Sequence, residues 1–323
     1  MPNAPKVILH NDVTEPLAKR LLSRFPQVNL FECNSFSGLK DAVADFRPDA
    51  VYSVRFTYDE PFPRDCLFSD GGPKWVTNAG VGVDHFGKWD PTRTIVTNAA
   101  GVAAGMIGEY VIGGFLYFTL DFPGMNADKA RQHWDATRRV APLSGKTLLV
   151  IGLGNSGQAI ATRAKAFGMR VIGTRANPVP MDGIDEVHAA SDLIRVLPEA
   201  DYVSVSTPLT PTTRGLIGKD QIAAMKPGVI FADVSRGGVV DQVALHEALQ
   251  SGHIRAGVLD VFDPEPLPQD SPLWHLPNVL ISPHCSAVHD RWEDDSFDMF
   301  LDNLDRFIKG EMLNNIVDPV RGY

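Results

Sequence analysis

The chain is poor in cysteine, has no long uninterrupted apolar run and contains no low-complexity tract. Its three cysteines, Cys33, Cys66 and Cys285, are far apart and odd in number, which argues against a disulfide framework and favours a reducing, cytoplasmic location. Zinc-ligand spacings such as CxxC are missing, so no metal site is predicted. The most apolar stretch, residues 101–120, contains Glu109 and is therefore interpreted as a buried helix rather than a membrane span.

Positive charge is also scarce. The 30 Lys and Arg residues against 39 Asp and Glu residues give a net charge of −9. A nucleic-acid-binding protein usually carries a basic stripe and a membrane-surface protein a polybasic segment, so neither partner is expected. The first apolar run, at 7–9, is too short for a signal-peptide core, and secretion is not expected either. With 44% hydrophobic residues, the 323-residue chain is expected to fold into about two domains.

Short apolar runs alternate with amphipathic segments along the chain, which is typical of α/β folds with parallel sheets. The first third of the chain predicts a small α/β domain with helices near 15–24 and 39–46. Its strands are predicted at 6–10, 28–31, 50–53, 75–78 and 95–98.

A second α/β series follows a long helix expected over 102–120 and a polar helix with a connecting arm over 121–139. Its strands are predicted at 147–151, 170–174, 202–206, 229–234, 256–260 and 279–282, and its helices at 156–167, 219–225 and 242–249. A last helix is expected over 291–309, because its phenylalanines and leucines recur at helical spacing. The tail at 312–323 is predicted to be irregular.

A glycine-rich loop follows the strand expected at 147–151. The loop fits the pattern GxGxxG and opens a predicted helix; it consists of Gly152, Leu153, Gly154, Asn155, Ser156 and Gly157. In such loops the first glycine makes a tight turn, the second lets the backbone approach a pyrophosphate, and the third lets helix and strand pack closely. Backbone N–H groups and the helix dipole then hold the phosphates. This strand–loop–helix context predicts dinucleotide binding at these residues.

The end of the next strand distinguishes NAD from NADP. An acidic residue about 20 residues beyond the glycine loop would bind the ribose 2′-hydroxyl of NAD, but no Asp or Glu occurs over 151–180. Thr174 and Arg175 stand at this point, and a guanidinium can bind a 2′-phosphate through charge-assisted hydrogen bonds. NADP is therefore the predicted cofactor, with NAD also possible. In the alternative interpretation Arg175 stacks on adenine, and Asp182 or Asp185 binds the ribose.

Three further patterns lie at the ends of predicted parallel strands, where open α/β sheets bind their ligands. They are VSRGGVVD with Arg236, LDVFDPEP with Glu265, and ISPHCSA with His284. Together with the glycine loop, they resemble the D-isomer-specific 2-hydroxyacid dehydrogenase family. The resemblance covers nearly the whole chain. It also rests on GVGVD at 80–84, TNA at 97–99 with Gly101 and Glu109, PLTP at 208–211 before Arg214 and Gly215, PLW at 272–274, and LPNV at 276–279.

The resemblance implies an α/β protein with two Rossmann-like, doubly wound parallel-sheet domains. The nucleotide-binding domain is inserted into a flavodoxin-like substrate-binding domain, to which the C-terminal helix returns. On this basis residues 1–99 and 291–323 are expected to form the substrate-binding domain, and residues 100–290 the NAD(P)-binding Rossmann domain. A homodimer is also implied, with its interface expected at 102–139.

Carried over by motif, the resemblance makes His284 the general acid/base, Glu265 its partner and Arg236 the anchor of the substrate. The chemistry suits these residue types. A protonated imidazole can deliver a proton to a carbonyl oxygen near neutral pH, a carboxylate favours its charged form, and a guanidinium can hold a substrate carboxylate. Asp260 resembles the residue that holds the nicotinamide amide. The resemblance further places beside the cofactor Thr207, Pro208, Val234 and Ser235.

On the substrate side, the backbone N–H groups of Val81 and Gly82 resemble the carboxylate cradle of the family. The loop SVRF at 53–56 contains Arg55, which either binds a second carboxylate or a phosphate of the substrate or is a surface charge. Trp292 either caps the pocket or packs in the core with the last helix.

The resemblance, together with Arg175, implies an NADP-preferring reductase of small 2-keto acids, of the glyoxylate or hydroxypyruvate type, that gives D-2-hydroxy acids. Two alternatives stay open. Relatives that act on formate or phosphite share the fold and the glycine loop, and a catalytically quiet NAD(P)H-sensing protein can retain the same residues. Loss of rate in His284→Ala with cofactor binding retained distinguishes an enzyme from a sensor.

Overall fold

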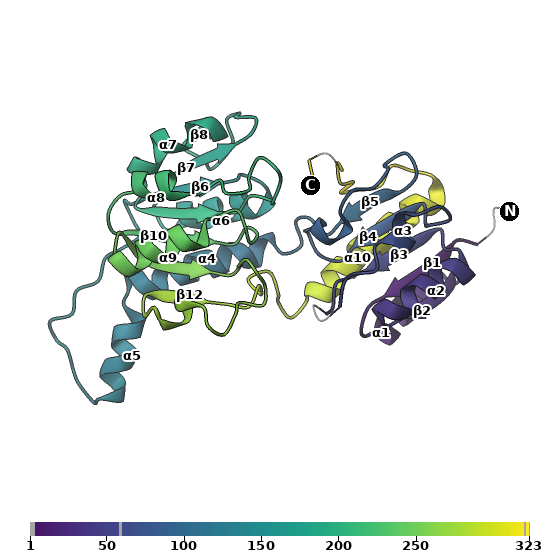
Figure 1. Cartoon of the computed structure of the whole chain (residues 1–323), viewed down its shortest axis with the longest axis horizontal. Coiled ribbons are helices and arrows are strands. Elements are labelled where there is room, and N and C mark those ends of the chain that lie inside the picture. The colour runs from purple at the N-terminus through teal and green to yellow at the C-terminus, as the bar shows by residue number, and fades with distance from the viewer. Residues whose placement is uncertain (1–3, 58–59, 320, 323) are drawn as a thin grey trace. The chain divides into compact units, whose positions relative to one another are not determined.

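The computed structural model describes residues 4–57, 60–319 and 321–322 (Figure 1). The backbone packs as two compact units. Unit 1 comprises Met1–Val102 and Asp290–Tyr323, and unit 2 comprises Ala103–His289. Unit 2 is therefore one continuous segment inserted into unit 1, and the chain passes between the units twice.

In its described residues, unit 1 contains a five-stranded parallel sheet in the order β2-β1-β3-β4-β5. The strands are β1 (Lys6–His10), β2 (Asn29–Cys33), β3 (Ala50–Ser53), β4 (Trp75–Asn78) and β5 (Ile95–Asn98). The helices are α1 (Glu15–Arg24), α2 (Phe36–Phe46), α3 (Asp65–Phe68) and α10 (Trp292–Lys309).

The alternation of side chains along these strands decides which helices cover each face of the sheet. Leu9 and Tyr52 point to the face covered by α1 and α10. Ile8 and Val51 point to the opposite face, which α2 and α3 cover. Because all strands run parallel, their carboxyl ends lie at one edge, where the loops that follow them come together.

Unit 2 contains a seven-stranded parallel sheet, within the described residues, in the order β12-β11-β10-β9-β6-β7-β8. The strands are β6 (Thr147–Ile151), β7 (Arg170–Arg175), β8 (Glu186–Ala189), β9 (Tyr202–Val205), β10 (Val229–Asp233), β11 (Ile254–Leu259) and β12 (Val279–Ile281). The helices are α4 (Ala104–Thr119), α5 (Phe122–Ala130), α6 (Asn155–Ala166), α7 (Leu193–Val196), α8 (Lys219–Ala224) and α9 (Gln242–Ser251).

Helices α7, α8 and α9 share a hydrophobic core with one face of this sheet, and α4 and α6 cover the other. The ring of Phe115 in α4 lies 5.0 Å from that of Tyr202 in β9. A Cβ on Gly114 would lie 2.6 Å from Val258 of β11, so α4 approaches the sheet too closely for a side chain at this position. Glycines in an otherwise apolar helix thus allow α4 to lie directly on the strands that lead to the site.

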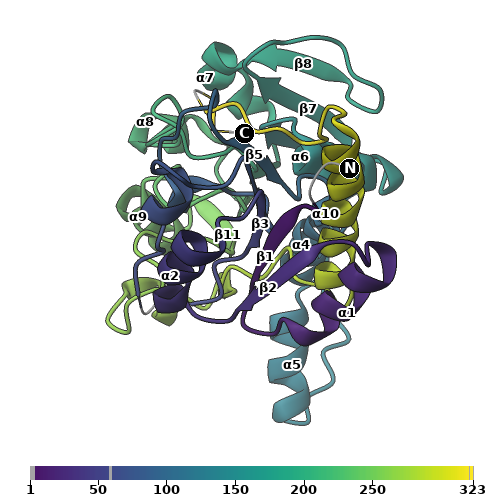
Figure 2. The ribbon, with the colours of Figure 1, turned by 90° about the vertical axis from the view of Figure 1, so that its right-hand side faces the viewer.

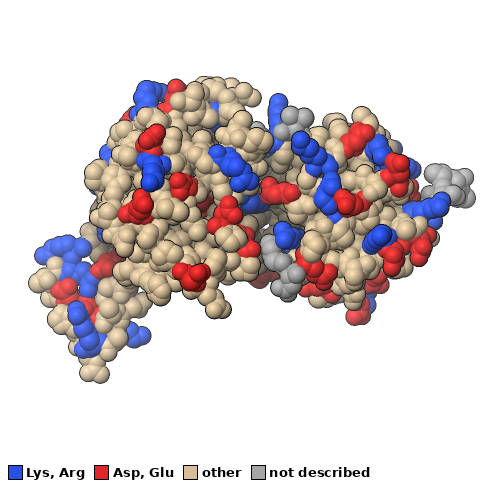
Figure 3. Space-filling view, viewed as in Figure 1, with Lys and Arg blue, Asp and Glu red and all other residues tan. Residues whose placement is uncertain are grey.

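An arm formed by α5 and the residues after it, 121–139, extends away from the rest of unit 2 (Figures 1 and 2). Arg138 pairs with Asp121 and Asp128, and Asp128 is nearly buried in spite of its charge. Figure 3 shows side chains of both charges on the arm. The side chain of Trp134 is 91% exposed. The arm therefore holds a large apolar group in solvent on a segment fixed by ion pairs.

The structure confirms most of the expected elements and corrects several. The strand expected at 28–31 is shifted to Asn29–Cys33, and the helix expected near 39–46 begins at Phe36, where the side chain of Ser35 accepts a hydrogen bond from Gly38 N (3.2 Å). Strand β8 (Glu186–Ala189) was not predicted, because this edge strand is short, polar and half-buried. No helix among the described residues combines the length and the apolarity needed to cross a bilayer.

Candidate functional site

The carboxyl ends of the strands in unit 2 bring the predicted site segments to one edge of the sheet. Following the strand order β12-β11-β10-β9-β6-β7, these ends carry His284, Glu265, Arg236, Thr207, Gly152 and Arg175. Neighbouring strands are about 4.8 Å apart, so the six ends form a row along which an extended ligand can lie. The strand order changes direction at β6, and α/β sheets bind their ligands at such a switch point.

The glycine loop is packed tightly on one side and open on the other. Gly152 has a φ of +99°, and a Cβ there would lie 2.8 Å from Thr207 Cγ2. A Cβ on Gly157 would lie 1.9 Å from Gly152 O, so α6 and β6 can approach this closely only with glycine. A Cβ on Gly154 would meet nothing within 4 Å. The loop therefore leaves space in front of its second glycine.

Helix α6 begins at this loop with no side-chain cap from the described residues. Its N-cap is Gly154, and it opens with Asn155, which is exposed, and Ser156, which is half-buried. In contrast, the side chains of Ser35 and Asp241 cap α2 and α9. The first N–H groups of α6 and the positive end of its dipole are thus left for an anion.

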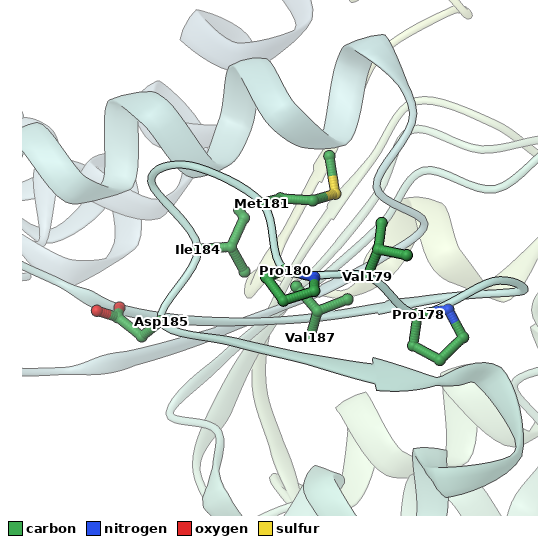
Figure 4. A pocket seen from close by; sticks show the side chains of 7 residues that line it. All are labelled: Pro178, Val179, Pro180, Met181, Ile184, Asp185 and Val187. Carbon is green, nitrogen blue, oxygen red and sulfur yellow. The ribbon is translucent and has the colours of Figure 1, made fainter.

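Arg175 ends β7, and a thioether rather than a carboxylate holds its guanidinium. Nη1 donates to Met181 Sδ (3.2 Å), which is a weak acceptor. Within the described residues Arg175 forms no ion pair. Met181 lines a pocket of about 190 Å³ together with Pro178, Val179, Pro180, Ile184, Asp185 and Val187 (Figure 4). A guanidinium held by so weak an acceptor can turn to a phosphate at small energetic cost.

Asp185, one of the two acids that could bind a ribose instead, is already engaged. Its carboxylate points away from the other lining side chains in Figure 4. It accepts hydrogen bonds from Lys165 Nζ (2.8 Å) and from Val171 N (2.7 Å). The Lys165 bond, followed by that of Val171, holds the pKa of Asp185 below its ordinary value. These contacts fix Asp185 between α6 and β7.

His284 and Glu265 form a hydrogen-bonded pair. Nδ1 of the imidazole lies 2.8 Å from Glu265 Oε2, and Glu265 Oε1 accepts the N–H of Phe262 (3.0 Å). Burial acts to raise the pKa of Glu265, but the hydrogen bond and charge of His284 outweigh it, and the net pKa is lowered. Because Glu265 occupies Nδ1, the Nε2 atom remains to exchange a proton with a ligand. The imidazole is 31% exposed, so a small molecule can reach it.

The Arg236 loop packs directly on the loop of Glu265. A Cβ on Gly237 would lie 1.9 Å from Phe262 O, so the backbone can pass here only as glycine. Arg236 Nη1 donates to Ser235 O (2.7 Å), and the charge of Arg236 contributes to the lowered pKa of Glu265. The structure therefore brings the three residues predicted as catalytic into one electrostatic group at the ends of β10, β11 and β12.

A buried carboxyl group lies beneath this loop. Asp233, the last residue of β10, accepts the N–H (3.0 Å) and the hydroxyl (2.5 Å) of Ser235 at Oδ1. Burial raises the pKa of Asp233 to about 7, with a further contribution from Asp260, against the opposing effects of Ser235 and Arg236. Val234 is buried and donates its N–H to Val205 O (3.0 Å). The loop is thus fixed to the sheet at its first two residues.

Asp260 holds the turn that carries His284. Its carboxylate is buried and accepts hydrogen bonds from Ser282 Oγ (2.6 Å), Cys285 N (2.8 Å) and Ser286 N (3.0 Å). In the structure Asp260 therefore also shapes this turn, a role that was not predicted from the sequence. Its contact with a nicotinamide amide stays a prediction.

In unit 1, two buried asparagines hold the loop that contains Val81 and Gly82. Asn78 Nδ2 donates to Gly82 O (2.7 Å), and Asn98 Nδ2 donates to Val81 O (2.7 Å). The N–H groups of Val81 and Gly82 have no acceptor among the residues that the structure describes. Successive unpaired N–H groups of this kind can bind a carboxylate.

The two remaining substrate-side residues also lie in unit 1. Arg55 is half-buried in the loop after β3, next to Phe56, whose ring lies 5.1 Å from that of His10. Trp292 begins α10 and packs against the core formed with α1. Of the two interpretations of Trp292, this packing favours the core residue.

The described residues of unit 2 fit a dinucleotide. The uncapped start of α6 suits a pyrophosphate, and the open side of Gly154 lets it approach. Thr207 Oγ1, beside the glycine loop, is a buried hydroxyl with no hydrogen-bond partner among the described residues. No group of three or more metal-ligating side chains is found in this part of the chain.

A sequence profile decides the family. The profile described as D-isomer specific 2-hydroxyacid dehydrogenase, NAD binding domain, matches residues 112–286, more than half of the chain. This chain belongs to the D-isomer specific 2-hydroxyacid dehydrogenase family. The family consists of NAD(P)-dependent oxidoreductases that act on CH–OH groups. The resemblance and the fold class stated from the sequence are therefore confirmed.

Other members of the 2-hydroxyacid dehydrogenase family match along most of the chain. D-3-phosphoglycerate dehydrogenase of Methanocaldococcus jannaschii is 38% identical over 311 residues, which are 95% of this chain and 59% of that protein. Glyoxylate reductase of Korarchaeum cryptofilum is 39% identical over 271 residues, 79% of this chain and 80% of that protein. The chain thus spans little more than half the length of the first relative and most of the second.

A solved structure from the family shares the fold. The D-isomer specific 2-hydroxyacid dehydrogenase of Xanthobacter autotrophicus Py2, in complex with NADPH and MES, superimposes with a TM-score of 0.82 at 28% identity. The match covers 99% of this chain and 100% of that one.

Several residues that shape the site of this chain were not predicted from its sequence. Tyr110 OH lies 2.5 Å from Ser282 Oγ, a contact between residues 172 positions apart. Asn78 and Asp233 were also not predicted as site residues, and Asn98 was noted only as part of the motif at 97–99. The asparagines end two neighbouring parallel strands, and that position was a signal available in the sequence. The Tyr110 contact had no such signal.

Proposed function

We propose that the chain is an NADP-preferring reductase that converts small 2-keto acids of the glyoxylate or hydroxypyruvate type to D-2-hydroxy acids. The observation that carries this proposal is the 2.8 Å pair of His284 and Glu265, in the same unit as the glycine loop and on its sheet edge. Unit 2 is the proposed NAD(P)-binding domain, and unit 1 is the proposed substrate-binding domain.

The residues of unit 2 account for the chemistry of the reduction. Bound reduced nicotinamide supplies a hydride to the keto carbon. Protonated His284 donates its Nε2 proton to the carbonyl oxygen as negative charge develops there. Glu265 orients the ring through Nδ1 and stabilises its charged form. Arg236 anchors the substrate carboxylate and polarises the carbonyl.

Unit 1 is proposed to recognise the carboxylate. The N–H groups of Val81 and Gly82 are held in place by the asparagine contacts at Gly82 O and Val81 O. Backbone N–H groups bind a carboxylate whatever side group the substrate carries. This suits an enzyme whose substrates share a 2-keto acid group and differ in the side group.

NADP preference is proposed from Arg175. Its guanidinium stands at the end of β7, where the ribose is bound in Rossmann folds. A thioether is its hydrogen-bond partner among the described residues. The Xanthobacter protein was crystallised with NADPH, which is consistent with this assignment. Further proposed cofactor contacts along the same sheet edge are Thr174, Thr207, Pro208, Val234, Ser235 and Asp260.

Initial rates test the reaction and the substrate. NADPH and NADH oxidation are followed with glyoxylate, hydroxypyruvate, pyruvate and phenylpyruvate, in the wild type and in His284→Gln. Fast NADPH oxidation with one of the small acids, reduced about a thousandfold in the variant, is the expected result. Undiminished turnover in His284→Gln contradicts the proposal.

The cofactor preference has its own test in Arg175→Asp. Removal of the guanidinium and repulsion of the 2′-phosphate are expected to lower the NADPH to NADH ratio of kcat/KM by about tenfold to a hundredfold. Arg195→Asp, on the exposed surface of the same unit, is the matched control and should leave this ratio unchanged. An unchanged ratio in Arg175→Asp instead supports adenine stacking by this residue.

A substrate with a second anionic group is the second candidate. It is favoured by the relatives named D-3-phosphoglycerate dehydrogenase and by the half-buried Arg55 after β3. Phosphohydroxypyruvate belongs in the panel for this reason. A preference for it that disappears in Arg55→Met assigns the phosphate to Arg55, whereas equal rates with glyoxylate remove this candidate.

Two other functions are outcomes of the same measurements. Tight NADPH binding with no turnover of any keto acid identifies a cofactor sensor. Reduction of NADP by formate or phosphite identifies a member with that activity. Either result would contradict the proposed keto acid reductase.

A homodimer through α4 and the arm at 102–139 is the proposed assembly. The arm projects from unit 2 and carries Trp134 and other exposed apolar side chains, among them Phe122 and Met125. Ion pairs of Arg138 fix the arm before any partner binds. A fixed projecting segment with exposed apolar groups suits a second copy of this chain, because a symmetric pair buries both arms at once.

A further inference from the structure

A chain of hydrogen bonds leads from α4 to the turn that carries His284. Tyr110 OH lies 2.5 Å from Ser282 Oγ, and Ser282 Oγ lies 2.6 Å from Asp260 Oδ1. In the second contact Ser282 donates its single hydroxyl proton to Asp260. Tyr110 must therefore be the donor to Ser282. The direction of the chain is fixed from the tyrosine to the carboxylate.

The carboxylate at the end of this chain binds the backbone on the far side of His284. Asp260 accepts the N–H groups of Cys285 (2.8 Å) and Ser286 (3.0 Å). On the near side, His284 N donates to Ser282 O (3.0 Å). Both flanks of His284 are thus tied to the pair formed by Ser282 and Asp260.

This turn needs such ties. His284 has a φ of +52°, in the left-handed region that residues with a side chain rarely adopt. A conformation of this kind persists only where the surrounding structure holds it. Glu265 holds the imidazole ring through Nδ1, but a contact at the end of the side chain does not fix the backbone. The backbone conformation therefore depends on Asp260 and its donors.

We propose that Tyr110 is a positioning residue for His284, acting through Ser282 and Asp260. The inference rests on the proposed role of His284 as the acid of the reduction. Tyr110 donates a hydrogen bond to Ser282, which orients the serine hydroxyl toward Asp260. Asp260 in turn holds the 284–286 turn in the conformation in which the His284 ring contacts Glu265. Its phenol is half-buried in the second turn of α4.

The chemistry of the phenol suits a fixed donor. Burial raises the pKa of Tyr110 to about 12, with the Ser282 bond acting in the opposite direction and the charge of Asp260 adding to the rise. Tyr110 therefore keeps its proton at neutral pH and remains able to donate it to Ser282. A phenylalanine fits the same space but removes the donor to Ser282 and leaves the serine held by Asp260 alone.

The test uses the full chain with four variants. Tyr110→Phe and Ser282→Ala each interrupt the chain, and the double variant asks whether they act together. Tyr202→Phe is the matched control, since Tyr202 OH also bonds α4, at Thr119 Oγ1 (2.9 Å), with no link to His284. The readouts are kcat, KM for the keto acid, the Kd of NADPH, and ¹⁵N NMR of the His284 ring, which reports the Nδ1–H tautomer.

We expect kcat and the tautomer of His284 to change, and KM and the Kd of NADPH to stay nearly constant. Tyr110→Phe should lower kcat about fivefold to tenfold and leave the KM and the NADPH Kd within twofold. Its His284 signals should show a larger share of the Nε2–H tautomer. The double variant should be no slower than Ser282→Ala. Tyr202→Phe should keep the wild-type kcat and tautomer although it loses a buried hydrogen bond of the same kind.

Two results would overturn the inference. One is a Tyr110→Phe variant with wild-type kcat and wild-type His284 signals. The other is an equal loss of kcat in Tyr202→Phe, which would make the effect a general weakening of α4. If the wild type turns over no keto acid, the proposed function fails, and the tautomer of His284 still decides whether Tyr110 positions it.

Discussion

Asp233 and Asp260 stand at the ends of two neighbouring strands with their carboxyl groups buried, and Asp260 N donates to Asp233 O (3.0 Å). The surroundings of the two groups differ. Asp260 accepts hydrogen bonds from the donors of the His284 turn, whereas the Asp233 carboxyl accepts at Oδ1 from Ser235 alone among the described residues and has a pKa of about 7. The Asp260 carboxyl thus has several hydrogen-bond donors around it, whereas burial raises the pKa of the Asp233 carboxyl.

Asp233→Asn should therefore stabilise unit 2 at alkaline pH. The unfolded carboxyl ionises near its ordinary pKa of 3.8, while the folded group keeps its proton up to about pH 7. Wild-type stability then falls as pH rises between these values, by at most about 4 kcal/mol, and is flat above pH 7. Asparagine resembles the protonated acid and removes this fall.

Urea unfolding at pH 4, 6 and 8 measures the effect. The variant should match the wild type at pH 4 and exceed it at pH 8. Asp270→Asn, in an exposed loop, should show the wild-type dependence. If Asp233→Asn is less stable than the wild type at pH 8, the Asp233 carboxyl is not protonated in the folded protein up to about pH 7.

His10 should give unit 1 the opposite dependence on pH. Its ring is buried against Phe36 and Phe56, and Nδ1 lies 2.8 Å from Ser53 Oγ. Burial lowers the pKa of His10 from 6.5 to about 4, although a backbone hydrogen bond at Ser35 opposes it. The folded ring is neutral, so stability is fully present above pH 6.5 and falls by at most about 3 kcal/mol as pH decreases to about 4.

His10→Asn keeps a donor for Ser53 and removes the titration. The variant should be less stable at pH 7, because ring packing is lost. Between pH 6.5 and 4 its free energy of unfolding should lack the decrease that His10 causes in the wild type. Tryptophan fluorescence, to which the fully buried Trp75 of unit 1 contributes, follows the transition. The same slope in wild type and variant would rule out His10 as its cause.

Glu265→Gln should slow reduction about tenfold to a hundredfold while NADPH binding is retained. The amide can still contact Nδ1 but lacks the charge that stabilises a protonated His284. The carboxylate of Glu265 has a lowered pKa and is therefore ionised at neutral pH, where the effect is measured. Glu199→Gln, which removes a carboxylate paired with Arg170 (3.0 Å), serves as control and should keep the wild-type rate.

Trp134→Ser should convert the proposed dimer into a monomer. The indole is 91% exposed on the arm, so its replacement costs the folded monomer little. Sedimentation velocity at several concentrations measures the assembly. Met312→Ser, at another exposed apolar residue that lies in unit 1, should leave it unchanged. A dimer that survives Trp134→Ser places the interface elsewhere.

The features that could be predicted from the sequence depend on short stretches of chain. The glycine loop has its turn, its open side and its helix start within Gly152–Gly157, so local steric rules are sufficient. Strands such as β6 and β10 are buried on both faces and therefore appear as continuous apolar runs. β8 has one neighbour strand and half-buried side chains, and its sequence EVHA carries no such pattern.

The contacts within the site were harder to predict. The ends of parallel strands gather by topology, which is why His284, Glu265 and Arg236 could be expected together. What Asp260 binds depends on the path of the 282–286 turn, and no spacing in the sequence specifies it. The same holds for Tyr110, whose partner is set by the way α4 lies on β11.

The insertion of unit 2 has a consequence for synthesis on the ribosome. All strands of unit 1 emerge first, but the face that carries Tyr52 and Trp75 is covered in the folded protein by Phe297 and Phe300 of α10. Helix α10 follows unit 2 in the chain, so that face waits on the order of ten seconds or more at ordinary rates of translation. Unit 2 can fold meanwhile as a continuous segment. The nascent sheet of unit 1 therefore exposes apolar side chains until α10 has been synthesised.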